Sequence, residues 1–424
     1  MKLRSYWLDT AKPAGDFRRT PLPRHVDVVV VGAGFTGLST ALHLARAGAS
    51  VALLEERTVG WGASGRNGGM ATTGLAIGYP TAVKRYGAER AEQMFLAYND
   101  AIDTVAKLCA DEGIDCDFVR AGKLTLASKP SHYQAYQRSA EMLADIGQDV
   151  TLVPAEAMRT EVGSTAFPGG MVDPLGAGLH VGKFCAGLAQ AAVRHGATIH
   201  EDCEVTALRR ISGRQHDVHT SRGIVRADQV VVATSGYTRG LTPWLRRRIV
   251  PIGSFIITTE PLPDDLVEEL MPTRRMASDT LRVCHYFRIT PDGRMLFGGR
   301  ARFAVNVRES DAASGRILRR EMVRFFPQLA DARIDYCWGG LVDMTMDQMV
   351  HAGERDGVLY SVGYSGHGVQ MATHMGAVLA QLVDGRAAAN PWSDLPFPPV
   401  PGHVGTPWFL PPAGAFFRLL DKVS

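Results

Sequence analysis

The amino-acid sequence predicts an α/β protein, α+β overall, with a Rossmann-like domain and a second domain built on a mostly antiparallel sheet. First, a β-branched run at 27–31 leads directly into a glycine turn and a helix with regular apolar spacing. Second, a strand, a glycine turn and a helix occur in the same order at 358–383. Third, alternating segments at 249–299 surround a Pro-Asp-Gly turn, which is typical of an antiparallel hairpin.

The glycine turn after the first strand predicts a dinucleotide site. Gly32 allows a tight turn, Gly34 lets the backbone approach a pyrophosphate, and Gly37 lets the next helix pack on the strand. The free N–H groups of that helix N-terminus bind phosphate oxygens. A carboxylate about twenty residues further on accepts ribose hydroxyls, and Glu55 is placed for this role after a strand at 51–54. The predicted contacts are Gly32, Ala33, Gly34, Phe35, Thr36, Gly37, Glu55 and Glu56.

A second glycine-dense segment, GWGASGRNGG at 60–69, follows at once. It has too many glycines for a helix and is too polar for a buried strand, so it predicts backbone running close to a flat ligand. A solvated surface loop is the alternative, but a domain that binds NAD alone has no need of this second loop. The predicted contacts are Gly62, Ala63, Ser64, Arg66, Asn67, Gly68 and Gly69.

The segments VVVVGAGFTGLSTALHLARAG, LLEE and GWGASGRNGG resemble the FAD-dependent amine and amino-acid oxidases related to D-amino-acid oxidase. Together with the leading YWLDT, the GASGRNGG loop looks most like the γ-glutamylputrescine oxidase branch. The resemblance runs from about residue 5 to 421 and implies bound FAD and two interleaved domains. It places the FAD-binding domain at 25–80, 150–240 and 336–385, the substrate domain at 81–149 and 241–335, an N-terminal surface arm at 1–24, and a C-terminal tail at 386–424.

Apolar periodicity predicts further elements along the chain. The resemblance places Val205 beside the adenine, and Thr234 and Gly236 beside the pyrophosphate. A plain core strand is the alternative for each of these residues. The predicted helices lie at 82–113, 133–146, 182–195 and 317–326, and the predicted strands at 116–127, 197–200, 204–208 and 223–232.

The second strand–turn–helix unit contains GYSGHG at 363–368. A helix N-terminus stabilises negative charge, and the resemblance implies that this helix points at the flavin N1–C2=O edge, where such charge develops on reduction. A surface turn is the less favoured alternative, because three glycines surround a histidine. The predicted cofactor contacts are Gly363, Gly366, His367, Gly368 and Val369.

Substrate recognition is expected from the hairpin at 281–302. Strand alternation places Arg282, Tyr286 and Arg288 on one face and His285 on the other, with Arg300 at the far end. A carboxylate-bearing substrate favours an arginine combined with an aromatic hydroxyl, whereas solvated arginines are the alternative. The predicted catalytic residues are His367, Tyr286 and Arg288.

Two further expectations concern the flavin. Sarcosine oxidases, which belong to the family that the sequence resembles, carry a lysine near flavin N5, but no lysine occurs between Lys183 and Lys422. A charged His367 or a hairpin arginine is therefore expected to supply positive charge for the reaction with oxygen. Cys337 precedes Trp-Gly-Gly, in a segment resembling the strand whose cysteine bonds to the flavin ring in those enzymes. A buried inert thiol is the alternative.

Composition excludes several other classes. The net charge of +3 without a basic block argues against nucleic-acid binding. The sequence contains no run of eighteen or more apolar residues, so we expect no membrane span. The N-terminal segment lacks the apolar core of a secretory signal. Six cysteines form neither a CxxC pair nor a metal-ligand spacing, so we expect reduced thiols, no metal and a cytoplasmic protein.

The sequence thus predicts oxidation of the C–N bond of a small amine by hydride transfer to flavin N5. The expected substrate is a γ-glutamyl-polyamine, a primary or secondary amine, or an amino acid. Molecular oxygen is expected to reoxidise the flavin and give hydrogen peroxide. A dehydrogenase that passes electrons to a carrier and a non-catalytic flavoprotein subunit are the alternatives.

Overall fold

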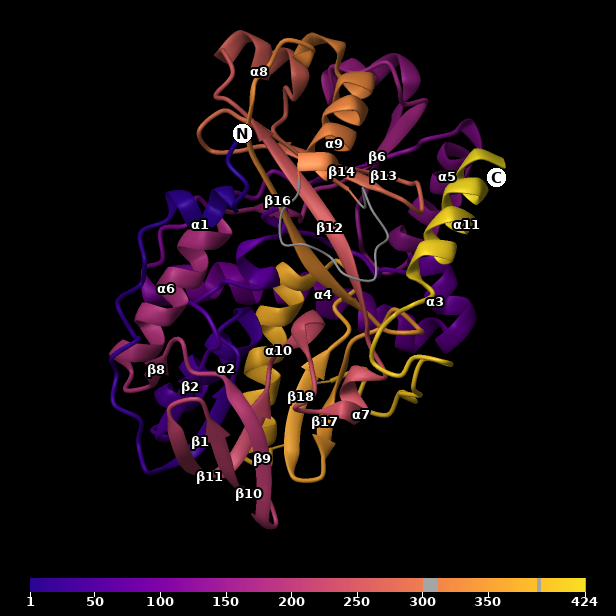
Figure 1. Cartoon of the computed structure of the whole chain (residues 1–424). Coiled ribbons are helices and arrows are strands. Elements are labelled where there is room, and N and C mark those ends of the chain that lie inside the picture. The colour runs from indigo at the N-terminus through magenta and orange to yellow at the C-terminus, as the bar shows by residue number, and fades with distance from the viewer. Residues whose placement is uncertain (300–311, 387–389, 424) are drawn as a thin grey trace.

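The computed structural model describes residues 1–299, 312–386 and 390–423, and Arg300 lies outside these residues. Within them, two sheets of eight strands each and one of two strands organise the chain. Figure 1 shows the two large sheets as lower and upper parts of the molecule, with the long strands β12 (Val250–Thr259) and β16 (Ile334–Met344) running between them. The predicted combination of a Rossmann-like sheet and a mostly antiparallel sheet is confirmed.

The first sheet has the order β17-β18-β11-β1-β2-β8, and its five strands from β18 to β8 are parallel. The hairpin β9–β10 extends it from β11. The strands are β1 (His25–Val31), β2 (Val51–Leu54), β8 (Thr198–His200), β9 (Val205–Ser212), β10 (Gln215–Thr220), β11 (Gly223–Val232), β17 (His351–Arg355) and β18 (Val358–Val362).

The two faces of this parallel sheet carry separate apolar cores. Val28 and Val30 of β1 join one cluster with the helices α2 (Phe35–Arg46), α4 (Ala88–Glu112), α6 (Val181–Arg194) and α10 (Gly368–Val383). Val29 and Val31 join the other cluster. A strand buried on both faces in this way reads as a continuous apolar run, as β1 does.

The second sheet has the order β16-β12-β15-β14-β13-β4-β6-β5, and every pair is antiparallel except β13–β4. One of its faces packs on α9 (Ala312–Phe325) and α8 (Asp264–Leu270) in a third apolar cluster. Its shorter strands are β4 (Lys123–Leu126), β5 (Thr151–Pro154), β6 (Gly169–Asp173), β13 (Met276–Asp279), β14 (His285–Ile289) and β15 (Met295–Gly299).

The remaining elements are shorter or lie outside the two large sheets. The helix predicted at 82–113 is broken at Gly87, where φ is +83°, so two helices form. No helix among the described residues is long and apolar enough to cross a membrane. These elements are α1 (Tyr6–Thr10), α3 (Tyr79–Tyr86), α5 (Pro130–Ala144), α7 (Pro243–Arg246), α11 (Leu410–Val423), β3 (Met70–Ala71) and β7 (Ala177–Gly178).

Sheet membership differs from the domain boundaries expected from the sequence. The strands β5, β6 and β16 belong to the second sheet, although 150–240 and 336–385 were assigned to the FAD-binding domain. Helix α4, expected in the substrate domain, packs in the core of the first sheet. The reason is that pairing between strands far apart in the sequence decides to which sheet a strand belongs. For example, Ile257 of β12 pairs with Cys337 of β16.

The N-terminal segment is not the surface arm that its polar, proline-rich composition predicts. Tyr6 and Trp7 of α1 are buried. The hydroxyl of Ser5 donates a hydrogen bond to the Gly65 carbonyl at 2.5 Å, and the indole N–H of Trp7 donates to the Asn67 carbonyl at 2.7 Å. This segment therefore supports the glycine-dense loop at 60–69.

Candidate active site

The glycine turn between β1 and α2 leaves no room for side chains. A Cβ on Gly37 would lie 1.9 Å from the Gly32 carbonyl oxygen, and a Cβ on Gly34 would lie 2.9 Å from the Ser64 Oγ. Gly32 has a φ of +104°, which favours glycine. The N-terminus of α2 begins at this turn without a side-chain cap. Its backbone donors are therefore suited to the phosphates of a dinucleotide.

Glu55 directly follows β2 and lies beside the same turn. Its carboxylate accepts hydrogen bonds from the backbone N–H groups of Ala33 and Arg57, each at 2.8 Å. Burial raises the pKa of this carboxyl group above its ordinary value. By contrast, Glu56 forms an ion pair with Arg239 at 3.1 Å. Glu55 is thus the better placed of the two predicted acids to accept ribose hydroxyls.

The loop at 60–69 is held by hydrogen bonds from α2 and β16 and by bonds within the loop. The Ser64 Oγ accepts from the N–H of Phe35 at 2.8 Å. The buried Arg66 donates to the Gly339 carbonyl at 3.1 Å, and its own carbonyl accepts from the indole of Trp338 at 3.0 Å. The Asn67 side-chain amide donates to the carbonyl of Ala63 at 3.0 Å. The loop is therefore fixed in place and not a solvated turn.

The ends of β11 and β18 approach the same region. The hydroxyls of Thr234 and Thr238 lie 2.7 Å apart, and a Cβ on Gly236 would lie 3.2 Å from the Leu341 Cβ. Gly363 has a φ of +87° and donates its N–H to the carboxylate of Asp343 at 2.8 Å.

Sequence reasoning missed Asp343, which lies at the end of β16. Burial raises the pKa of this carboxyl group to about 6. The available signal was an acidic residue near the end of a strand whose second half is otherwise apolar. Val205, which was expected beside the adenine, is the first residue of β9. It follows closely after Cys203, whose N–H donates a hydrogen bond to the Glu55 carbonyl at 2.8 Å, just beyond the end of β2.

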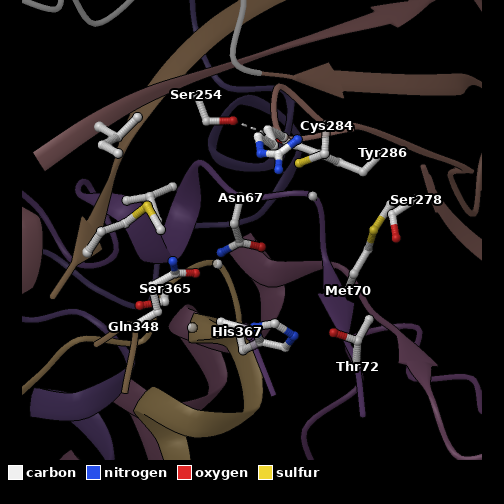
Figure 2. A pocket seen from close by; sticks show the side chains of 18 of the residues that line it. Asn67, Met70, Thr72, Ser254, Ser278, Cys284, Tyr286, Gln348, Ser365 and His367 are labelled. Atoms are coloured by element: carbon white, nitrogen blue, oxygen red, sulfur yellow. Dashed lines mark hydrogen bonds between the residues drawn. The ribbon is translucent and has the colours of Figure 1, made fainter. Parts of the chain in front are cut away.

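A cavity of about 790 Å³ separates the loop at 60–69 and the start of α10 from the second sheet. Figure 2 shows Ser254 and Tyr286 on one side and Ser365 and His367 on the other, with Asn67 between them. Predicted cofactor contacts that line it are Ala63, Arg66, Asn67, Gly68, Gly366, His367, Gly368 and Val369. Further lining residues include Met70, Thr72, Lys123, Ile252, Met276, Ser278, Arg282, Cys284, Gly340 and Gln348.

Tyr286 faces this cavity, whereas Arg288 does not line it. The Tyr286 hydroxyl lies 2.9 Å from the Ser254 Oγ. Arg288 shares the same face of β14 but is buried, and it donates hydrogen bonds to the carbonyls of Gly69 and Leu179. Tyr286 and Arg288 therefore share one face of β14 as predicted, but the guanidinium of Arg288 is engaged by backbone carbonyls and not directed at the cavity.

His367 lines the cavity as the residue before α10. Burial, followed by the nearby positive charge of Lys123, lowers the pKa of its imidazole to about 3. Its Nδ1 has no hydrogen-bond partner among the described residues. Burial in this site therefore disfavours the charged His367 that the sequence predicts.

Lys123 is a basic residue at the cavity that the sequence analysis did not identify. It extends from β4, lines the cavity, and donates a hydrogen bond to the Thr73 carbonyl at 3.3 Å. Burial lowers the pKa of its ammonium group, and the negative charge of Asp173 partly opposes this effect. In the sequence, Lys123 precedes the stretch without lysine between Lys183 and Lys422, and nothing local to it indicates the cavity.

The structure also contradicts flavin attachment through Cys337. Its side chain belongs to the apolar cluster between the second sheet and α9. A Cβ on Gly315 of α9 would lie 3.1 Å from its sulfur. The neighbouring Trp338 instead reaches the loop at 60–69. Alternation along β16 thus directs the sulfur away from the cavity.

Comparison with known proteins agrees with this arrangement. Residues 27–382 match the profile of the family described as FAD dependent oxidoreductase, DAO. The chain is 32% identical to the γ-glutamylputrescine oxidoreductase of Escherichia coli K12, over 99% of this chain and 98% of that protein. It is 33% identical to the probable oxidoreductase OrdL of Haemophilus influenzae, over 90% and 88% of the two chains.

Solved structures share the fold. The crystal structure of glycine oxidase from Geobacillus kaustophilus has a TM-score of 0.74 at 21% identity, over 90% of this chain and 100% of that one. L-proline dehydrogenase from P. horikoshii has a TM-score of 0.73, over 88% and 96% of the two chains. The glycine cradle and the Glu55 acceptor fit a dinucleotide. The chain belongs to the DAO family of FAD-dependent oxidoreductases, which act on amines and amino acids, and FAD is its cofactor.

Proposed function

We propose that the protein oxidises the C–N bond of a small amine and uses molecular oxygen as the final electron acceptor. The observation that carries the proposal is the cavity, which places polar side chains of the second sheet opposite the FAD-binding loop and the start of α10. The sequence relationship to γ-glutamylputrescine oxidoreductase supports a γ-glutamyl amine as the first substrate to test. Bound FAD supplies a hydride acceptor at N5 and returns the electrons to oxygen, giving hydrogen peroxide.

The cavity suits an amine that enters as its neutral form. A hydride leaves the carbon next to nitrogen, a proton leaves the nitrogen, and the resulting C=N bond is hydrolysed by water. The neutral imidazole of His367 lines the cavity, where it is suited to contact the neutral substrate amine. The hydroxyls of Tyr286 and Ser254 supply a second polar contact. Apolar walls such as Met70 and Met276 limit water around the reacting carbon.

Two positive features favour transfer of electrons to oxygen. Helix α10 begins at the cavity without a side-chain cap, so its N-terminal dipole stabilises negative charge there. Lys123 adds a cation in the same enclosed space, where one charge contributes several kcal/mol to such a step. This pair supports an oxidase over the dehydrogenase alternative.

The test has two stages with the purified holoenzyme. Anaerobic mixing with polyamines, γ-glutamyl amines, N-methyl amino acids and amino acids should bleach the flavin for one class. Stopped-flow mixing of the reduced enzyme with oxygen should then restore the absorbance at least as fast as turnover. Reoxidation much slower than turnover with an artificial acceptor would favour the dehydrogenase, and bleaching by no amine would refute the proposed activity.

A further inference from the structure

A second hollow adjoins the cavity at one end, and we call it the vestibule. It has a volume of about 460 Å³. It shares five lining residues with the cavity, namely Ala76, Thr280, Leu281, Arg282 and Gln348. The vestibule also carries Arg85 of α3, Lys129, His132 of α5 and Asp421 of α11. A molecule that extends beyond the cavity at this end therefore enters a region rich in positive charge.

A carboxylate already occupies this region. The two oxygens of Asp421 accept hydrogen bonds from the consecutive backbone N–H groups of Arg282 and Val283, each at 3.0 Å. The guanidinium of Arg282 lies 4.0 Å from the same carboxylate. Only 12% of the Asp421 side chain is exposed. Consecutive N–H groups of this kind form a concave anion site, and here the chain supplies its own anion.

Basic side chains outnumber acidic ones among the described residues that line the vestibule. Asp421 is the single carboxylate among the described residues that line it, against Arg85, Lys129, Arg282 and the titratable His132. The Nδ1 of His132 lies 2.6 Å from the Thr280 hydroxyl. The pKa of His132 is lowered by burial and by the charges of Lys129 and Arg282. An anion that displaces Asp421 in this basic setting finds the same two N–H donors.

Helix α11, which carries Asp421, lies at the edge of the second sheet near α5 (Figure 1). Its Phe417 lines the cavity, while the side chains of Phe416 and Leu419 are 56% and 57% exposed. A helix with large apolar side chains facing solvent is only partly embedded in the body of the protein. Exchange of the Asp421 carboxylate for another anion is therefore compatible with the rest of the fold.

We propose that the vestibule binds the carboxylate of an amine substrate, and that Asp421 occupies this site when the substrate is absent. The inference rests on the proposed amine oxidation and names the substrate class: a flexible chain with the reacting amine at one end and a carboxylate at the other. The amine lies in the cavity near His367, and the carboxylate takes the N–H groups of Arg282 and Val283.

The experiment compares two amines that differ only by one carboxylate. γ-Glutamylputrescine has it, and N-(4-aminobutanoyl)putrescine lacks it. In the holoenzyme, Arg282→Gln should raise KM for the first amine about tenfold, because a hydrogen-bonded charge pair is lost, and leave KM for the second unchanged. Asp421→Asn should lower KM for the first amine several-fold, since the competing charge is removed. Arg209→Gln, at an exposed site on β9, is the control for loss of one positive charge.

Equal effects on both amines would overturn the proposal, because they would show that Asp421 and Arg282 only fix α11. Calorimetric binding of glutarate to the holoenzyme provides a readout without turnover. Glutarate should bind several-fold more tightly to Asp421→Asn than to the unmodified protein, and more weakly to Arg282→Gln. If neither amine reduces the flavin, the proposed function fails while glutarate binding still decides the vestibule. Equal glutarate affinity in all three proteins would overturn the anion site.

Discussion

The hydroxyl of Tyr286 lies 2.9 Å from the Oγ of Ser254, so that β14 and β12 place a linked pair of hydroxyls over the cavity. The Tyr286 ring fits there because two glycines face it. A Cβ on Gly298 would lie 2.2 Å from the ring, and one on Gly68 would lie 3.1 Å from it. This arrangement gives the first prediction.

Tyr286→Phe should retain the packing of the ring and lose the hydroxyl contact. A neutral hydrogen bond contributes about 1 kcal/mol, so kcat/KM for the amine should fall about fivefold. Ser254→Ala should have a similar effect, and the double variant should lose less than the sum of the two. Steady-state kinetics provide the measurement, and an unchanged melting temperature shows that folding is retained. Strictly additive losses would contradict the coupling of the two hydroxyls.

Gly34→Val should yield protein without FAD. The φ of −86° at Gly34 is open to other residues, but a Cβ there already meets the Ser64 Oγ at 2.9 Å. A valine side chain would occupy the space where the pyrophosphate approaches the turn. Flavin absorbance of the purified protein is the measurement, with Gly240→Val as the control, because Gly240 has open space around it. Full flavin content in Gly34→Val would contradict the assignment of the turn.

Lys123→Met should slow reoxidation by oxygen about a hundredfold, while flavin reduction by the amine changes less. The expectation follows from the loss of one cation in an enclosed site. Because burial lowers the pKa of the ammonium, reoxidation should also decline as the pH rises through that pKa, and the variant should not show this decline. Stopped-flow absorbance measures both. Lys84→Met, on the exposed surface of α3, is the control.

His367→Ala should leave reoxidation nearly unchanged, since its imidazole is neutral.

His367 should contribute to acid sensitivity of the fold. Its pKa is about 3 in the folded protein against an ordinary value of 6.5, so the unfolded chain binds a proton first as the pH falls. Stability is therefore retained above pH 6.5 and lost between there and about pH 3. Relative to His367→Gln, the native protein should lose up to about 1 kcal/mol of unfolding free energy per pH unit in this window. Urea unfolding at several pH values measures the difference, and parallel curves would contradict it.

Local sequence order explains what could be predicted. The Gly32–Gly37 turn and Glu55 lie on consecutive elements, so the spacing of the chain alone brings them together. The site residues that were missed depend on distant pairings. Lys123 lies in the cavity because β4 pairs with β13, some 150 residues further along the chain. Asp343 reaches the N–H of Gly363 because β16 joins the second sheet. Alternation correctly placed Tyr286 and Arg288 on one face, but the sequence does not encode where along the strand the cavity ends.

The support of the loop at 60–69 has a consequence for the order of events during biosynthesis. Trp338, which holds Arg66 through its indole, is separated from it by 272 positions. At the usual rate of translation, on the order of 10 residues per second, that separation corresponds to roughly half a minute. Ser5 and Trp7 are made first and are ready to contact the loop, whereas β16 is not. The loop therefore lacks its β16 contacts until that strand has been made. We expect FAD to load late in synthesis or after release from the ribosome.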